Sequence, residues 1–151
     1  GGWIMLLAAL ARKERIAGLV GIAAAPDFTE DLMWAQFTDA QKSDIVENGA
    51  LIEPTEYGDE PYTITHALIE DGRNQLLLRN PIKLECPVRL IQGMQDPDVP
   101  WQTSIRLTEA LVSKDVRIDL IKTGDHRLSE PDQLDVITKH LDEIIEKVTV
   151  G

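Results

Sequence analysis

The most constraining feature of this 151-residue chain is the order of its apolar and helical segments after residue 80. A short apolar run over Val88–Gln92 is followed by a helical pattern over Trp101–Val112, and a second extended run covers Val116–Ile121. Strand, helix and strand in this order predict a parallel sheet with helices packed on it. Pro100 is expected at the first position of the helix. The second strand alternates apolar and charged residues, which is typical of an edge strand.

The N-terminal part of the chain shows the same alternation of helix and strand. Residues Trp3–Ala11 are apolar all round, which predicts a helix buried on several sides. The apolar run over Arg15–Ala25 is bounded by charges and by Pro26, and it predicts a parallel strand buried on both faces. Such a strand needs a neighbouring strand on each of its edges.

The alternation of helices and strands is interrupted between residues 28 and 80. Thr29 is expected to cap one helix, and Thr38 with Gln41 forms a capping-box pattern for a second helix that ends at Asn48–Gly49. The pattern over residues 51–65 predicts two short extended segments, one on each side of Gly58–Asp59 in the sequence.

Two more helices are predicted, one before and one after the strands that follow residue 80 in the sequence. Ala67–Leu78 forms the first, and the second is the C-terminal helix, with Ser129 as its N-cap. The apolar stripe of the C-terminal helix consists of Leu134, Ile137, Leu141, Ile144 and Val148.

A carboxylate and an imidazole follow the two C-terminal strands. Asp96 comes after the strand over Val88–Gln92, and His126 comes after the strand over Val116–Ile121. An acid followed by a histidine is the end of a Ser-Asp-His triad, in which the histidine moves protons and the acid orients it. The alternative for His126 is a turn histidine that bonds the local backbone. Asp125 is expected to shape the turn beside it.

Other acidic and basic groups are weaker candidates for chemistry. Asp98 is expected to stabilise the N-terminus of the following helix, and Asp27 is a less favoured acid at another strand end. His66 and His140 fit no metal-ligand spacing, so we expect neither a metal nor a cofactor.

Composition excludes several functional classes. With 15 basic and 26 acidic residues the formal charge is −11, which disfavours nucleic acids and anionic membranes as partners. The only cysteine, Cys86, permits no internal disulfide and is expected to be a small buried hydrophobe. The N-terminal apolar runs are too short to span a membrane, and the default expectation for the compartment is cytoplasmic.

Three motifs resemble those of the α/β-hydrolases. They are Gly1-Gly2-Trp3, the acid loop G-x-x-D-x-x-V-P over residues 93–100, and the histidine turn over residues 124–129. The chain is similar along its whole length to bacterial relatives of the mitochondrial abhydrolases that cleave palmitoyl-cysteine thioesters and acyl glucuronides. The resemblance implies the C-terminal part of a mostly parallel sheet flanked by helices. It divides the chain into core segments 1–27 and 81–151 and a helical and extended cap insertion over 28–80.

The resemblance also implies an activity. The expected enzyme is a serine hydrolase that cleaves carboxylic esters or thioesters of small molecules or acylated proteins. Asp96 and His126 would belong to its triad, and the serine would lie upstream of Gly1 in the other half of the same hydrolase. None of the four serines of this chain lies in a G-x-S-x-G context: Ser43, Ser104, Ser113 and Ser129.

Four large side chains are candidates for substrate contacts. Met33, Trp34 and Phe37 have the spacing to line an acyl pocket beneath a cap, although the same pattern fits the cap's own core. Trp101 would border the cleft beside the acid loop. The alternative for the whole chain is a truncated or non-catalytic hydrolase-like module with a binding or structural role, which the missing serine supports.

Overall fold

The computed structural model describes residues 1–53 and 61–150, and it divides into two compact units. The core unit comprises Gly1–Pro26 and Leu77–Gly151, and the second unit comprises Asp27–Leu76. The predicted turn at Gly58–Asp59 lies outside the described residues. Within the described residues, no helix combines the length and the apolar composition needed to cross a membrane.

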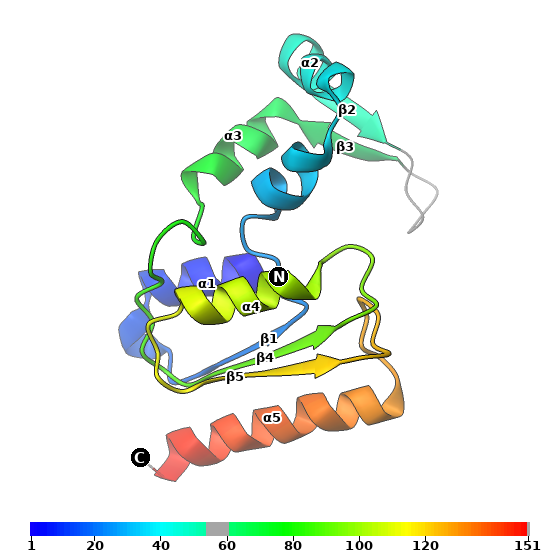
Figure 1. The fold of residues 1–151 in the computed structure, drawn as a ribbon. Helices are drawn as coiled ribbons and strands as arrows, with labels where there is room; N and C mark the ends of the chain where they lie inside the picture. Colours follow the sequence, from blue (N-terminus) through cyan, green and yellow to red (C-terminus); the bar gives the residue numbers. More distant parts are fainter. Residues whose placement is uncertain (54–60, 151) are drawn as a thin grey trace. The chain divides into compact units, whose positions relative to one another are not determined.

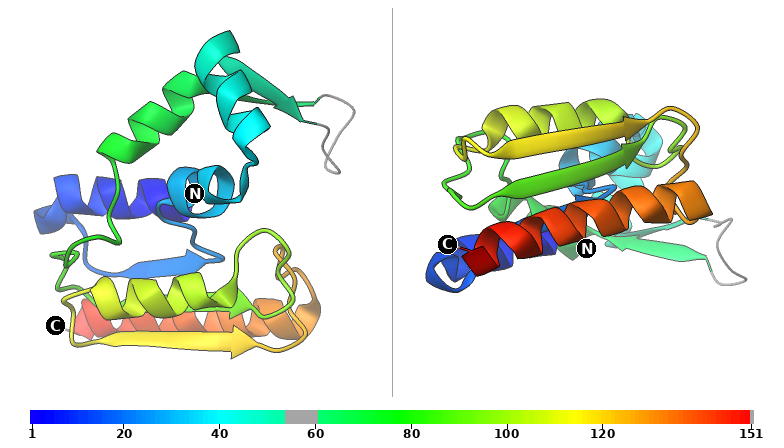
Figure 2. Two further views of the ribbon diagram at one scale, coloured as in Figure 1. Left: turned by 45° about the horizontal axis from the view of Figure 1, so that its top comes forward. Right: turned by 90° about the horizontal axis from the view of Figure 1, so that it is seen from below.

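A parallel three-stranded sheet forms the centre of the core unit. Its strands are β1 (Leu19–Ile22), β4 (Val88–Gly93) and β5 (Val116–Ile121), in the order β1-β4-β5. The helices α1 (Gly2–Ala11) and α4 (Trp101–Ala110) cover one face of the sheet, and α5 (Pro131–Val150) covers the other, as Figures 1 and 2 show. The predicted α/β class with a parallel sheet is therefore confirmed.

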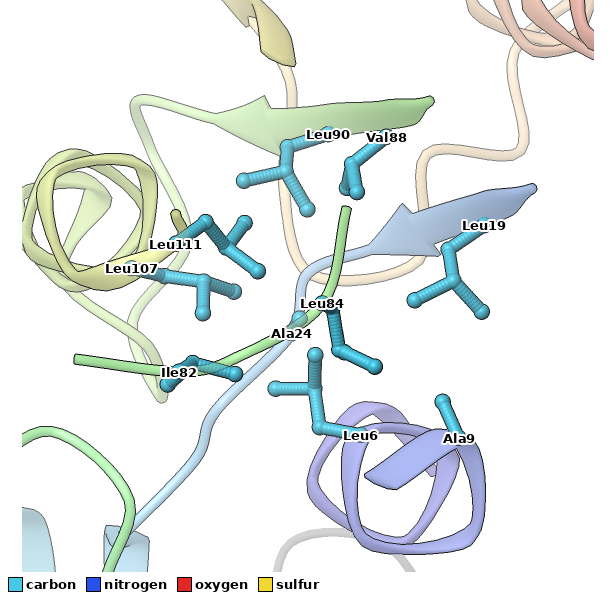
Figure 3. Close-up of a cluster of buried hydrophobic side chains, with 10 residues drawn as sticks. All are labelled: Leu6, Ala9, Leu19, Ala24, Ile82, Leu84, Val88, Leu90, Leu107 and Leu111. Carbon is cyan, nitrogen blue, oxygen red and sulfur yellow. The ribbon is translucent and has the colours of Figure 1, made fainter. Parts of the chain in front are cut away.

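The main hydrophobic core lies between the sheet and the two helices α1 and α4 (Figure 3). Val88 and Leu90 of β4 are alternate residues of one strand and therefore point to the same face. They meet Leu6 of α1 and Leu107 of α4, and all four side chains are at most 1% exposed. Removing this apolar surface from water is the main force that holds the helices on the sheet.

The N-terminal helix and strand are less buried than the sequence predicts. In α1 only one face is buried, with Trp3, Leu6 and Ala9, whereas Ile4 is 72% exposed. The strand β1 has one hydrogen-bonded neighbour among the described strands, and its Ile22 is 42% exposed. The predictions of burial on several sides and on both faces were therefore wrong for the described structure.

Two helix starts also differ from the predictions. Pro100 is the N-cap of α4 with an extended ψ of 131°, not its first helical residue. The helix α4 ends at Ala110, and Leu111 is extended and forms a bridge to Ile82. The last helix begins at Pro131, so Ser129 lies two residues before it, and the Gln133 side chain instead accepts a hydrogen bond from the Glu130 N–H.

The predicted apolar stripe of α5 does not coincide with its buried face. Leu134, Leu141 and Val148 are 40–48% exposed, and only Ile144 of the stripe is fully buried. The buried positions also include His140, whose Nε2 lies 2.6 Å from Asp119 Oδ2. The pattern also did not reveal a buried charge that faces this helix.

That charge is Arg89 of β4, whose side chain is fully buried beneath α5. Its guanidinium donates two hydrogen bonds to Glu143, from Nε at 3.0 Å and from Nη2 at 2.8 Å, and a further bond to the Val88 carbonyl. A buried cation must be paired, so α5 presents Glu143 to the sheet.

Among its described residues, the second unit contains a two-stranded antiparallel sheet and four helical segments. Its elements are a π-helical turn (Thr29–Met33), a 3₁₀ turn (Trp34–Gln36), α2 (Asp39–Asn48), β2 (Ala50–Glu53), β3 (Tyr62–Thr65) and α3 (His66–Asn74). The capping box of Thr38 and Gln41 and the left-handed Gly49 at the end of α2, with φ 82°, are confirmed.

Two details of this unit differ from the predictions. Thr29 caps no helix: it lies inside the π-helical turn, is buried, and its hydroxyl has no hydrogen-bond partner among the described residues. The backbone carbonyl of Asp27 accepts the first hydrogen bonds of that turn instead. The helix α3 ends at Asn74, four residues before the predicted end at Leu78.

Candidate active site

The predicted acid and base meet at the carboxyl edge of the core sheet. Asp96 lies three residues after the end of β4, and His126 lies five residues after the end of β5. Because these neighbouring strands are parallel, both loops leave the sheet at the same edge. The Nδ1 atom of His126 lies 2.9 Å from the Oδ2 atom of Asp96.

The loops are held together by backbone hydrogen bonds as well. The Met94 N–H donates to the carbonyl of Ile121, and the Gln95 N–H donates to the carbonyl of Gly124, each at 2.9 Å. These bonds continue the pairing of β4 with β5 beyond the ends of the strands. Main-chain contacts therefore hold the loop of the acid beside the loop of the base.

The carboxylate of Asp96 is fully buried and accepts four hydrogen bonds. Its Oδ1 accepts from the backbone N–H groups of Asp98 and Val99, and its Oδ2 accepts from Gln92 and from His126. Burial alone would raise the pKa of Asp96, but the hydrogen bonds from the Val99 N–H, from His126 and from the Asp98 N–H together lower it below its ordinary value. Asp96 is thus an ionised, fixed acceptor.

His126 is accessible, as a catalytic base must be. Its side chain is 42% exposed, and its only hydrogen bond to a described residue is the one from Nδ1 to Asp96. A bond from Nδ1–H to a carboxylate leaves Nε2 as the proton acceptor of the neutral ring. The ring therefore presents Nε2 to another group.

The turn that carries His126 is shaped by its neighbour Asp125, as predicted. The Asp125 Oδ1 accepts hydrogen bonds from the backbone N–H groups of Arg127 and Leu128, both at 3.0 Å. Leu128 has a positive φ of 47° and is fully buried. A left-handed leucine costs about 1 kcal/mol or more, so its buried side chain and this turn must hold the backbone in place.

The start of α1 lies at the same carboxyl edge. Gly2 packs so tightly against Ala24, which follows β1, that a Cβ built on Gly2 would lie 2.5 Å from the Ala24 Cβ. Gly1 is the N-cap of α1. Free N–H groups of a helix start favour negative charge nearby.

The four predicted substrate contacts lie in two different places. Met33, Trp34 and Phe37 pack against the buried cluster of the second unit, which consists of Ile45, Ile64 and Ile69. The Trp34 ring also stacks against the guanidinium of Arg73, at 4.7 Å from the centroid. Trp101 is the first residue of α4, directly after the acid loop. A substrate-binding role for these four residues stays a prediction.

Sequence reasoning missed two polar residues that support the acid. Gln92 and Ser104 are buried, and the Ser104 hydroxyl donates to the Gln92 carbonyl oxygen at 3.1 Å. The one sequence feature that could have revealed them is the amide of Gln92, which stands within the apolar run of β4.

One group of possible metal ligands exists among the described residues. Single oxygen or nitrogen atoms of Asp96, Asp98 and His126 lie within 4.8 Å of one another. The two oxygens of Asp96 already accept two hydrogen bonds each, which uses the lone pairs that a cation would need. The arrangement is that of an acid orienting a base.

Comparison with known proteins identifies relatives along the whole chain. No protein-family model matches it. The mouse mitochondrial palmitoyl-protein thioesterase ABHD10 is 39% identical over 150 residues, which cover 99% of this chain and 50% of the mouse protein. The human protein of the same name is 35% identical over 150 residues, covering 99% of this chain and 49% of the human protein. The chain thus spans about half the length of these relatives.

Solved structures agree with the sequence comparison. A crystal structure described as a hydrolase from Agrobacterium vitis S4 has a TM-score of 0.89 and 41% identity, covering 96% of this chain and 58% of that chain. Mouse α/β-hydrolase domain-containing protein 10 has a TM-score of 0.86 and 36% identity, covering 98% of this chain and 59% of that chain. The predicted α/β-hydrolase fold is confirmed, and the chain is related along its whole length to the ABHD10 thioesterases.

Proposed function

We propose that this chain supplies the acid and the base of a serine hydrolase that cleaves carboxylic esters or thioesters. The observation that carries the proposal is the 2.9 Å contact between His126 Nδ1 and the buried, ionised Asp96. This contact favours the tautomer of the neutral ring that carries its proton on Nδ1, and Nε2 is then able to accept a proton from a nucleophile. The relatives named as thioesterases support the same reaction class.

The mechanism divides hydrolysis into acylation and deacylation. A serine hydroxyl attacks the substrate carbonyl and transfers its proton to Nε2 of His126, and Asp96 stabilises the imidazolium that forms. The tetrahedral intermediate expels an alcohol or a thiol, which takes that proton. Water then gives a proton to Nε2 and attacks the acyl-enzyme carbonyl. The second tetrahedral intermediate releases the carboxylic acid and expels the serine oxygen, which takes the proton back from Nε2.

We place the serine two residues upstream of Gly1, in the other half of the hydrolase. In this arrangement Gly1 is the last glycine of a G-x-S-x-G elbow and α1 is the helix that follows the nucleophile. The packing of Gly2 against Ala24 supports this, because it puts the start of α1 at the carboxyl edge that carries Asp96 and His126. The backbone N–H after the serine would be one donor of the oxyanion hole.

The proposed substrates are long-chain acyl thioesters and esters. The support is the activity for which the relatives are named, palmitoyl-protein thioesterase, at 35–39% identity. Trp101 and the second unit are the proposed sources of acyl selectivity.

The test is intact-mass spectrometry of the complete protein that contains this chain, before and after treatment with a fluorophosphonate probe. One probe adduct, together with hydrolysis of a palmitoyl thioester, is the expected result. Replacing Asp96 with Asn or His126 with Ala should abolish both. If the complete protein takes up no probe and hydrolyses neither an ester nor a thioester, the alternative of a non-catalytic binding module replaces the proposal.

A further inference from the structure

We propose that Gln92 is a positioning residue that holds the Asp96 carboxylate against His126, and that Ser104 holds Gln92 in turn. The inference rests on the proposed function, because the expected effect of losing the Gln92 contact is a lower rate of the proposed reaction. Gln92 does not touch the reacting atoms. It acts through Asp96.

The first argument is the cost of burying an amide in this position. Gln92 lies on the same face of β4 as Val88 and Leu90, which belong to the hydrophobic core. Its side chain is 0% exposed. An amide buried without partners is destabilising, so a buried glutamine in a core strand needs hydrogen bonds that an apolar residue would not.

Those hydrogen bonds converge on the acid loop. The Nε2 of Gln92 donates to Asp96 Oδ2 at 3.0 Å and to the Val99 carbonyl at 3.2 Å. Val99 also donates its N–H to Asp96 Oδ1. The amide therefore contacts both ends of the loop segment 96–99 and binds one carboxylate oxygen, while the backbone binds the other.

The orientation of the amide is determined by its surroundings. Nε2 faces a carboxylate oxygen and a carbonyl oxygen, which are both acceptors, and Oε1 faces the Ser104 hydroxyl, which can donate. Turning the amide over would place Oε1 against two acceptors. Ser104 is 1% exposed and lies on α4, so it ties the orientation of Gln92 to a rigid helix.

The consequence concerns the oxygen that His126 uses. Gln92 and His126 both donate to Oδ2 of Asp96. Two backbone N–H groups hold Oδ1, and the Gln92 bond adds an anchor at Oδ2, so the carboxylate is held at both oxygens against rotation about its Cβ–Cγ bond. Gln92 thus keeps Oδ2 pointing at Nδ1 of His126, which catalysis by the pair requires.

The test compares two variants in the complete protein that contains this chain. Gln92→Met keeps the volume of the side chain and removes the donor, so we expect kcat to fall about tenfold or more, with KM changed less than about twofold. Ser104→Ala should lower kcat by a smaller factor. In the Gln92→Met background Ser104→Ala should have no further effect on kcat, because it acts only through Gln92.

A second readout is independent of hydrolysis. The Nδ1 proton of His126 gives a proton NMR signal while it is bonded to Asp96, and we expect this signal to move upfield and broaden in Gln92→Met. Ser104→Ala should cause a smaller shift in the same direction and serves as the test if Gln92→Met does not fold. The matched control is Thr108→Ala, which removes a hydroxyl one turn further along α4 that donates only to a backbone carbonyl.

The outcomes separate this inference from the proposed function. An active wild type whose kcat and Nδ1 signal are both unchanged in Gln92→Met overturns the positioning role. If the wild type is inactive but its Nδ1 signal still changes in Gln92→Met, the proposed hydrolase function is contradicted. The positioning link from Gln92 to His126 is then still supported. Additive effects of Ser104→Ala and Gln92→Met on kcat would overturn the role of Ser104.

Discussion

Gly93 and Gly124 touch through their backbones, at the point where the loops that carry the acid and the histidine leave the sheet. A Cβ built on Gly93 would lie 2.5 Å from the carbonyl oxygen of Asp125 and closer still to that of Gly124. A Cβ built on Gly124 would lie 3.1 Å from the Cα of Gly93. Any larger residue at position 93 would therefore separate the two loops.

Replacing Gly93 with Ala should break the contact between Asp96 and His126. The added Cβ meets two rigid backbone carbonyls, so the loops must move apart, and we expect a loss of about 1–3 kcal/mol of unfolding free energy. The proposed hydrolysis of a palmitoyl thioester by the complete protein should be lost as well. Gly49→Ala is the contrast: its φ is 82° but a Cβ would meet nothing within 4 Å, so it should cost about 1 kcal/mol without loss of activity. Urea unfolding and activity assays distinguish the two, and normal activity of Gly93→Ala would contradict the argument.

Asp96→Asn should inactivate the proposed hydrolase, assayed as the complete protein that contains this chain, without unfolding it. An asparagine can donate to Nδ1 and thereby place the proton of His126 on Nε2, where it blocks the base, and we expect kcat to fall about 10⁴-fold by analogy with the serine-protease triad. Asp98→Asn is the matched control, since the contact of Asp98 with Asp96 is made by its backbone N–H. Its effect on kcat should stay within about twofold. Equal losses in both variants would show that charge in the loop matters, and not the orientation of His126.

The stability of the chain should decrease steeply in acid because of Glu143. The hydrogen bonds from Arg89 lower the pKa of Glu143 from its ordinary value of 4.5 to about 2. A carboxylate with a lowered pKa stabilises the fold fully above the ordinary value, and this contribution falls as the pH drops below 4.5 and is lost near pH 2. Urea unfolding at a series of pH values should show a shallower decrease between pH 4.5 and 2 for Glu143→Gln than for wild type. The control, Glu146→Gln on the exposed side of α5, should follow the wild-type curve.

Thr38→Ala should loosen α2 in the second unit. The Thr38 hydroxyl accepts from the Gln41 N–H, and the Gln41 side chain accepts from the Thr38 N–H, so the substitution removes half of the capping box. We expect a loss of about 1 kcal/mol, seen as about fivefold faster hydrogen exchange of the α2 amides. Ser43→Ala, at an exposed position inside the same helix, should not speed exchange, because alanine favours a helix interior. Unchanged exchange in Thr38→Ala would show that the packing of Ile45 alone holds the helix.

Local patterns in the sequence were sufficient where neighbouring residues decide the structure. The order of strands and helices placed Asp96 and His126 at the same edge of a parallel sheet, because parallel strands end at the same edge. The capping box at Thr38 and the left-handed Gly49 are also local, since each involves residues within one turn of a helix.

Tertiary contacts decided what these patterns could not. Apolar periodicity assigned the buried face of α5 to a stripe that includes Leu134 and Leu141, yet both leucines are exposed. The same helix instead pairs its Glu143 with the buried Arg89, which no local pattern predicted. The support of Asp96 by Gln92 joins a strand, a loop and a helix that are separate in sequence, so it depends on packing alone. The sequence by itself determined which residues could act as acid and base, because strand ends are local. Only the tertiary structure decided how buried charged and amide groups orient that acid and that base. A buried polar group must form hydrogen bonds, and its partners can come from elements that are far away in the sequence.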